Sequence, residues 1–302
     1  MQQEFIRPGA WYSGVAKSGR PWAVLPRGSV AGGAMIAAAW AVSWAQVQPL
    51  APFYFFPLWL GYILLVDGIV LARRGMSLLQ QGAGQFLALF AISAVFWWAY
   101  EALNIPVQNW RYLGIEQYST LQYSLFATLP FSTVLPAVLE TATLLGSFGP
   151  SSRYLVAARV PPPRRLWLLV TLGVGAAVAP WFWPSWTYPL IWCSLFLVVD
   201  PINWWVGRPS ISRLLRADHT SMLLTLGASG LTCGFFWEMW NYYSYPKWIY
   251  VLPGISAPKL FEMPLPGYLG YVPFALELYA MYNLVLFVAR RSSPFERVMQ
   301  AP

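Results

Sequence analysis

Long runs of apolar residues, separated by short polar or basic segments, make up most of this chain. A helix that crosses the hydrocarbon core of a membrane needs roughly 20 mostly apolar residues. Eight runs approach that length: 31–48, 52–72, 83–103, 125–146, 166–183, 188–207, 221–242 and 268–289. The pattern therefore predicts an all-α fold, a polytopic membrane helix bundle with about eight transmembrane helices.

The first of these runs is the weakest. It is short and rich in alanine, and its end resembles the cleavage site of a signal peptide. About thirty polar and mixed residues precede it, which is unlike the start of a signal peptide. We therefore expect the run to be a retained span.

The distribution of lysine and arginine predicts the orientation of the bundle. Basic residues in short loops favour the cytoplasmic side of a membrane. If the N-terminus is inside, only Arg111, Lys247 and Lys259 of the 19 basic residues fall in outer loops. We therefore expect both termini in the cytoplasm and a multi-pass protein in the cell's inner (cytoplasmic) membrane. The net charge of +8 follows from this topology, so nucleic acid is not an expected partner.

The composition agrees with a membrane protein and excludes several kinds of metal site. Charged residues are 10% of the chain, against about 25% in an average soluble domain. The single histidine, His219, rules out paired imidazole ligands for haem and disfavours a histidine-built zinc or di-iron site. Cys193 and Cys233 lie in apolar runs and are expected to be small buried hydrophobes. We expect no metal and no cofactor.

The second half of the chain repeats features of the first half. Four pairs of residues recur at one common separation: Glu101 and Glu238, Asn104 and Asn241, Pro136 and Pro273, and Glu140 and Glu277. Asp67 and Asp200 form a similar pair at nearly the same separation. We therefore predict two four-helix repeats, residues 31–150 and 166–290. A basic Pro-rich cytoplasmic linker, 151–165, would join them, with a cytoplasmic N-terminal segment, 1–30, and tail, 291–302.

An even number of spans in each half makes the two repeats parallel, with a pseudo-twofold axis along the membrane normal. Such an arrangement brings equivalent helices together and favours a pocket at the repeat interface. The outer loops 105–124 and 243–267 are long and rich in aromatic residues and proline. Because loops of this length often shape a site, we place the pocket toward the outer leaflet, between the third, fourth, seventh and eighth spans.

Buried carboxyl groups are the candidate catalytic groups of this pocket. A carboxylate inside the bilayer costs about 2.5–3.5 kcal/mol on insertion scales, so it persists only if protonated, paired or facing a polar cavity. We predict four catalytic acids or bases: Glu238, Glu277, Glu101 and Glu140. The proline four residues before Glu140 or Glu277 is expected to kink its helix and free a backbone carbonyl. Buried acids can also link helices without any catalytic task, and for each single residue that alternative stays open.

Further polar and aromatic residues are predicted to bind the substrate. Asn104 and Asn241 follow a glutamate by three residues and share its helical face, where they can hydrogen-bond its carboxyl group. The predicted substrate-binding residues are Asn104, Asn241, Trp237, Trp248, Tyr250, Trp110, Tyr112, Glu262, Asp67 and Asp200. Glu262 has no acidic counterpart in the first half and breaks the symmetry.

The order of these residues resembles the integral-membrane lycopene cyclase type of carotenoid enzyme. That family carries a Trp-Asp pair, a later Trp-aromatic pair and a Pro-x-Glu-Glu run. The matching positions here are Trp237 with Glu238, Trp248 with Tyr250, and Pro273 with Glu277. Weaker echoes are Tyr100 with Glu101, Trp110 with Tyr112, and Pro136 with Glu140. The chain departs from the family in having Glu for Asp, in replacing the Pro-x-Glu-Glu run by PAVLE and PFALE, and in a unit of four spans rather than three.

The resemblance implies acid-base chemistry on a long polyene without a cofactor. A carboxylic acid would protonate a terminal double bond, aromatic rings would shelter the carbocation, and a carboxylate would remove a proton after ring closure. Glu277 and Glu238 would be the acid and the base, in either order. The chain has no DDxxD run, which disfavours a magnesium-dependent prenyltransferase acting on a diphosphate.

Three functions remain open from the residues alone. The first is an enzyme or binder of an apolar isoprenoid, carotenoid or lipid at the repeat interface. The second is a non-catalytic subunit or assembly factor of a larger membrane complex, which abundant lipid-facing aromatic residues would suit. The third is a proton-coupled transporter, because parallel repeats and buried carboxyl groups occur in transporters.

Overall fold

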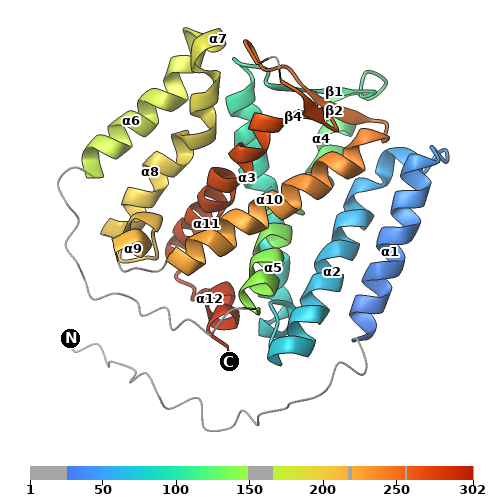
Figure 1. Ribbon diagram of the computed structural model, residues 1–302, viewed down its shortest axis with the longest axis horizontal. Helices are drawn as coiled ribbons and strands as arrows, with labels where there is room; N and C mark the ends of the chain where they lie inside the picture. The colour runs from blue at the N-terminus through green and yellow to red at the C-terminus, as the bar shows by residue number, and fades with distance from the viewer. Residues whose placement is uncertain (1–25, 149–165, 217–219, 256, 302) are drawn as a thin grey trace.

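The computed structural model of the chain describes residues 26–148, 166–216, 220–255 and 257–301. The predicted linker 151–165, His219 and most of the predicted N-terminal segment lie outside the described residues. Almost all of the regular structure is helical (Figure 1). The few strands gather at one end of the bundle, and helix α12 and the C-terminus lie at the opposite end.

Residues 26–148 form five α-helices, two short 3-10 helices and one strand. The elements are α1 (Arg27–Trp44), η1 (Ala51–Phe53), α2 (Phe55–Arg74), η2 (Leu79–Gln81), α3 (Ala83–Asn104), β1 (Trp110–Leu113), α4 (Thr120–Phe131) and α5 (Val134–Gly146). Each of the first four predicted runs contains at least one of these helices, so their helical nature is confirmed.

The described residues from 166 onward form further long helices and several short elements. Its helices are α6 (Leu166–Val178), η3 (Ala179–Trp181), α7 (Pro184–Thr187), η4 (Tyr188–Leu190), α8 (Ile191–Trp205), α9 (Ile211–Arg216), α10 (Thr220–Tyr242), η5 (Leu265–Gly270), α11 (Tyr271–Val288) and α12 (Pro294–Met299). Its strands are β2 (Lys247–Tyr250), β3 (Lys259–Leu260) and β4 (Met263–Pro264). The last four predicted runs are therefore helical as well.

Five helical stretches among the described residues are long and apolar enough to cross a membrane. They are Phe55–Arg74, Ala83–Asn104, Thr120–Gly146, Pro184–Trp205 and Leu265–Val288. A further apolar stretch, Leu166–Trp181, is shorter. These lengths and compositions are typical of an integral membrane protein.

Two helix pairs flank a central group of helices (Figure 1). Helix α1 packs on α2 at one side and α6 packs on α8 at the other, while α3, α5, α10 and α11 form the middle. Small residues allow the close approach of α1 and α2. A Cβ atom on Gly32 would lie 2.5 Å from the carbonyl oxygen of Gly61, and one on Gly61 would lie 2.7 Å from that of Gly32. Such contacts are common where transmembrane helices pack.

The prolines that precede Glu140 and Glu277 do not kink continuous helices. Helix α4 ends at Phe131 and α5 begins at Val134, so Pro136 lies in the first turn of a new helix. Pro273 likewise lies in the first turn of α11, directly after η5. A proline in the first turn costs no helical hydrogen bond, because the N–H groups there have no partner within the helix. The expected kinks are breaks between helices instead.

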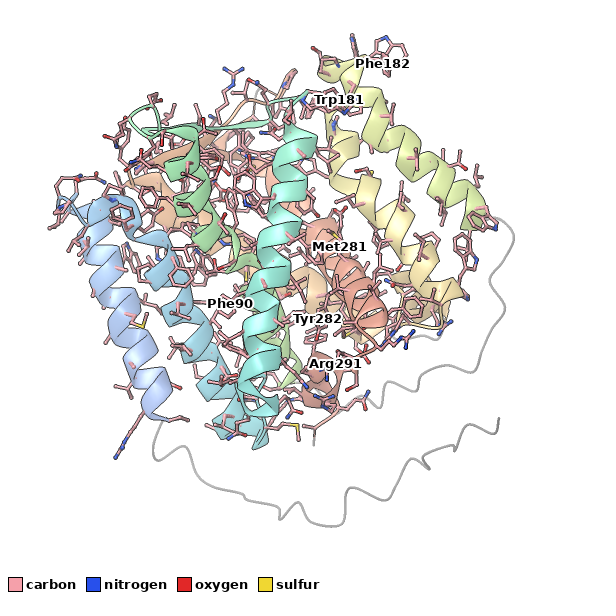
Figure 2. All side chains as sticks on the ribbon, turned by 180° about the vertical axis from the view of Figure 1, so that it is seen from behind. Phe90, Trp181, Phe182, Met281, Tyr282 and Arg291 are labelled. Carbon is pink, nitrogen blue, oxygen red and sulfur yellow. The ribbon has the colours of Figure 1, made fainter. Side chains whose placement is uncertain are left out.

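The two ends of the bundle differ in chemistry. At the end away from the strands, Arg74 of α2 donates hydrogen bonds to the carbonyl oxygens of Val298 and Met299 on α12. Figure 2 shows Arg291 toward this end, whereas Trp181 and Phe182 project at the end that carries the strands. Basic residues therefore mark one end of the bundle and exposed aromatic rings mark the other.

Candidate functional site

Glu101, near the C-terminus of α3, accepts hydrogen bonds from the N–H or O–H groups of three aromatic side chains. Its Oε1 atom accepts hydrogen bonds from Trp97 Nε1 at 2.9 Å, Trp110 Nε1 at 3.0 Å and Tyr112 OH at 2.6 Å. Trp97 lies one helical turn before Glu101, and the other two donors come from β1. One carboxyl oxygen thus fixes the orientation of three rings from two elements.

Glu238, near the C-terminus of α10, holds a second cluster of the same design. Its Oε1 accepts hydrogen bonds from Tyr271 OH at 2.6 Å, Tyr250 OH at 2.7 Å and Trp248 Nε1 at 3.4 Å. Glu238 is fully buried, and its second oxygen, Oε2, has no hydrogen-bond partner among the described residues. We call these groups the Glu101 cluster (Glu101, Trp97, Trp110, Tyr112) and the Glu238 cluster (Glu238, Trp248, Tyr250, Tyr271).

The two asparagines that follow the glutamates bind backbone rather than the carboxyl groups. Asn104 Nδ2 donates to the carbonyl oxygen of Trp110 at 2.9 Å, and its Oδ1 accepts from the N–H of Asn109 at 2.7 Å. Asn241 Nδ2 donates to the carbonyl oxygen of Trp248 at 2.8 Å, and its Oδ1 accepts from the N–H of the same residue at 2.9 Å. Each asparagine therefore ties the end of its helix to the strand that supplies the aromatic rings.

Strands β1 and β2 join the two clusters. They pair antiparallel, with Trp110 opposite Tyr250 and Tyr112 opposite Trp248. Alternate residues of a strand point to the same face, so these four aromatic side chains share one face of the two-stranded ribbon. The ribbon lies across one end of the helical bundle (Figure 1).

A chamber of about 500 Å³ lies beneath this ribbon. The predicted third, fourth, seventh and eighth spans all contribute to its wall, through α3, α4, α10, and η5 with α11. The ends of α2 and α8 that face the ribbon complete it. Aromatic side chains dominate the lining, among them Phe55, Trp97, Trp110, Tyr112, Tyr123, Phe131, Trp192, Trp237, Trp248, Tyr250, Tyr271 and Phe274.

Charge is nearly absent from the chamber wall. In the described part of the chain, Lys247 is the only charged residue of the lining. Its ammonium group forms an ion pair with Glu262 and donates a hydrogen bond to the carbonyl oxygen of Tyr242 at 3.2 Å. Glu262, predicted to bind substrate, neutralises this lysine and does not itself belong to the lining.

The four predicted catalytic glutamates do not line the chamber in the described structure. Glu101 and Glu238 lie behind the aromatic rings and bind their N–H and O–H groups, while ring surfaces face the cavity. The sequence predicted a pocket lined by carboxyl groups, and that expectation is wrong in this respect. Carboxyl groups lie one layer further out, and aromatic rings form the surface that a ligand would touch.

Glu140 and Glu277 are both fully buried, but their neighbours differ. Glu140 on α5 lies beside Asp67 of α2. Glu277 on α11 accepts a hydrogen bond at 2.9 Å from the backbone N–H of Phe196 on α8, and the phenol of Tyr100 lies beside it. The two residues therefore match in sequence position without matching in their contacts.

Asp67 and Asp200 hold the connections that follow their helices. Asp67 accepts hydrogen bonds from Ser77 Oγ and from the N–H of Leu79, both at 2.9 Å. Asp200 accepts from the N–H of Ile211 at 2.5 Å and from Ser212 through both its N–H, at 3.0 Å, and its hydroxyl, at 2.6 Å. Neither carboxylate contributes to the chamber wall. In the described structure both carboxylates hold loops, and their role in substrate binding stays a prediction.

The structure adds aromatic residues to the site that the sequence did not single out: Trp97, Trp192, Tyr271 and Phe274. Trp97 precedes Glu101 by four residues, and this helical spacing was a signal that could have found it. Trp192 comes from α8 and packs on Trp110, with ring centroids 5.3 Å apart. No local pattern predicts that contact, because its partners are far apart in the chain.

Burial raises the pKa of Tyr112 and of Tyr250 well above the ordinary value of tyrosine. Loss of hydration is the main cause, and the neighbouring glutamate in each cluster adds to it. Both phenols therefore keep their protons at neutral pH and remain hydrogen-bond donors to the glutamates.

Together, the apolar helices and the aromatic chamber are typical of a helical membrane protein with an internal pocket. Among the described residues there is no cluster of three or more His, Cys, Asp or Glu side chains that could hold a metal ion. Comparison of the chain with protein-family models, with curated proteins and with solved structures gives no match.

Proposed function

We propose that this protein is an integral membrane protein that binds a neutral, apolar isoprenoid, carotenoid or other lipid in the aromatic chamber and acts on it by acid-base chemistry. The observation that carries the proposal is the chamber itself, a partly open cavity of about 500 Å³ lined mainly by aromatic rings. Pockets of this size and apolar character suit small hydrophobic ligands.

The charges around the chamber favour a neutral ligand. Lys247 is paired with Glu262, so the described lining offers no unpaired cation to a phosphate or carboxylate group. Binding a diphosphate there would remove its hydration without a compensating ion pair, which is costly. A neutral hydrocarbon has no such requirement.

The Glu238 cluster supplies the link between a bound ligand and a buried acid. Tyr250 and Tyr271 line the chamber, and both donate hydrogen bonds to Glu238. In the resemblance to the lycopene cyclase type, Glu238 and Glu277 are the acid and the base. Of these two, Glu238 has direct hydrogen bonds to residues of the chamber wall, whereas Tyr100, beside Glu277, packs behind Trp192 and Phe274.

The membrane arrangement that we propose has eight spans in two parallel repeats, with both termini in the cytoplasm and the protein in the inner membrane. The matching hydrogen bonds of the Glu101 and Glu238 clusters support the repeats. Exposed aromatic residues at the strand end support its placement at a membrane interface, because tryptophan is enriched there. These residues are Trp181, Phe182, Trp183 and Trp186.

The binding proposal is tested by filling the chamber. Ala127 of α4 contributes to the lining, so Ala127→Trp would place a bulky ring in the cavity without removing any side-chain hydrogen bond. Leu125→Trp on the same helix is the matched control, because Leu125 is exposed and outside the lining. Solvent extraction and mass spectrometry of the purified proteins should find a neutral lipid in the native chain and in Leu125→Trp, and much less in Ala127→Trp. Equal amounts in all three, or none in the native chain, would contradict the proposal.

The acid-base proposal is tested with lycopene as a neutral linear polyene. We expect Glu238→Gln and Glu277→Gln to lower cyclisation by about a hundredfold or more while the folded protein still elutes as a single species. Native protein that binds lycopene and forms no cyclic product would restrict the function to binding.

A non-catalytic subunit of a larger membrane complex is the second candidate. The exposed aromatic tip at α7, where Trp186 is 87% exposed, is the observation that favours it. Co-purification of a larger complex that dissociates on Trp186→Ser, together with unchanged behaviour of the Glu→Gln variants, would support this candidate.

A further inference from the structure

Two phenylalanines of the chamber wall are also exposed on the outer surface of the molecule. Phe53 of η1 is 47% exposed and Phe126 of α4 is 39% exposed, yet both belong to the lining. Their ring centroids are 5.1 Å apart in an edge-to-face contact. The chamber therefore reaches the surface between η1 and α4, where this ring pair lies.

The outer surface beside this ring pair is apolar. Leu121, Leu125 and Leu129 of α4 are all more than half exposed. A stretch that includes α4 and α5, Thr120–Gly146, is one of those long and apolar enough to cross a membrane. In a bilayer, this surface faces hydrocarbon rather than water.

Hydrogen bonds and an ion pair hold other parts of the chamber wall together, and Ile255 of the lining is 37% exposed there. The β1–β2 pairing covers the end of the chamber, and the ion pair between Lys247 and Glu262 lies beside β2. Between η4 and the segment after β2, Tyr188 OH donates to the carbonyl oxygen of Pro253 at 3.1 Å. By contrast, Phe53 and Phe126 meet only through their rings.

Phe126 lies on a short helix, α4, that is distinct from α5. Helix α4 is separated from α5 by Ser132 and Thr133, and Pro130 lies within its last turn. The start of α4 is fixed by a capping box between Ser119 and Gln122. Trp98 Nε1 of α3 donates to Thr128 Oγ1 of α4 at 3.0 Å, so a side-chain rotation of Phe126 would separate the two rings without moving the helix.

We propose that the gap between η1 and α4 is a lateral portal through which a neutral hydrocarbon enters the chamber from the bilayer, with Phe53 and Phe126 as its gate. This inference rests on the proposed function, because it assumes that the chamber binds such a ligand. It adds the route, and it identifies the source of the ligand as the membrane rather than the aqueous phase.

The test measures rates in vesicles that contain the full chain. Tritiated squalene is introduced with donor vesicles, samples are quenched in detergent, and the protein is captured to count bound label. We expect Phe126→Ala to load about tenfold faster than the native chain, because the gating ring is gone. Phe126→Trp should load more slowly, since a larger ring blocks the gap. Leu125→Ala is the matched control and should load at the native rate.

The outcomes separate the portal from the proposed function. If the native chain binds no squalene saturably, the proposed function fails for linear isoprenoid hydrocarbons, and the portal fails with it. If the native chain binds squalene but both Phe126 variants load at the native rate, the portal is wrong and the function stands. A variant that only loses contacts with the ligand would release it faster without loading it faster, so a faster loading rate is specific to a gate. Native-like elution of each variant establishes that it is folded.

Discussion

Two pairs of glutamates recur at the same separation along this chain, but the contacts of the two pairs differ in the structure. Glu101 and Glu238 each accept hydrogen bonds from two aromatic residues of the following strand and from one further ring. Glu140 lies beside an aspartate, whereas Glu277 accepts from a backbone N–H. Both pairs have the same separation in the sequence, but only Glu101 and Glu238 have equivalent contacts in the structure. The repeated position of a residue therefore does not by itself indicate a repeated role.

The largest effect should come from removing the acceptor of the more deeply buried cluster. Glu238→Ala removes the shared acceptor of two phenols and an indole N–H, which then keep only the contacts of Trp248 with Tyr250 at 3.1 Å and of Tyr250 with Tyr271 at 3.4 Å. We expect the free energy of unfolding to fall by about 4 kcal/mol. Glu101→Ala should cost about 2 kcal/mol, because Glu101 is half-buried and water can replace the carboxylate. Denaturant titration in detergent measures both values. Glu238→Gln, which keeps an acceptor oxygen, is the control, and equal losses for the two alanine variants would contradict the role of burial.

The asparagines test whether the two clusters are equivalent where they meet the strands. Asn104→Leu and Asn241→Leu each remove two hydrogen bonds to backbone. We expect each to lower the free energy of unfolding by about 2 kcal/mol, with little difference between them. If the free energy of unfolding fell in only one of the two variants, the clusters would share their geometry but contribute unequally to stability.

The second pair of glutamates should respond unequally to the same substitution. Glu277→Leu leaves the N–H of Phe196 without its acceptor, so the free energy of unfolding should fall by about 1.5 kcal/mol. Glu140→Leu removes a buried acid that lies beside Asp67, and replacement of buried polar groups by apolar ones is often neutral or stabilising. Thermal denaturation of the two variants side by side gives the sign of each change. A similar fall in stability in both variants would contradict the expected difference between Glu140 and Glu277.

The smallest effect concerns alkaline pH. The pKa values of Tyr112 and Tyr250 are raised in the folded state, so their protonated forms stabilise the fold. This contribution is fully present below the ordinary tyrosine pKa of about 10 and is lost as the pH rises toward the folded-state values. Stability should therefore fall at high pH, and less steeply in the double variant Tyr112→Phe, Tyr250→Phe. Spectrophotometric titration should show two fewer late-ionising phenols in that variant.

Much of the site was within reach of sequence reasoning. The apolar runs predicted the described helices that are longer than two turns. The aromatic residues beside Glu238 and in the segments after Asn104 and Asn241 correctly indicated part of the chamber wall. Trp110, Tyr112, Trp237, Trp248 and Tyr250 all belong to the lining. The predicted place of the pocket, among four particular spans, agrees with the elements that enclose it.

The errors share one cause. Asp67 and Asp200 are predicted to bind substrate because a carboxylate in an apolar run needs a polar environment. In the structure, loop backbone and serine hydroxyls supply that environment. The kinks expected at Pro136 and Pro273 are helix boundaries, since a proline pattern alone does not reveal where the preceding helix ends. The sequence shows that each aspartate needs a polar partner and that each proline disturbs a helix. It does not show which group is the partner or where the preceding helix ends.

Local composition was enough to identify the helices and the aromatic segments, because hydrocarbon length and strand alternation act on neighbouring residues. Which side of each ring faces the cavity was decided only by the packing of distant elements. Glu101 and Glu238 draw the N–H and O–H edges of the rings outward, so that an apolar chamber forms where the sequence suggested a polar one. The direction of a hydrogen bond depends on where its partner lies in space, and that information is absent from spacing along the chain.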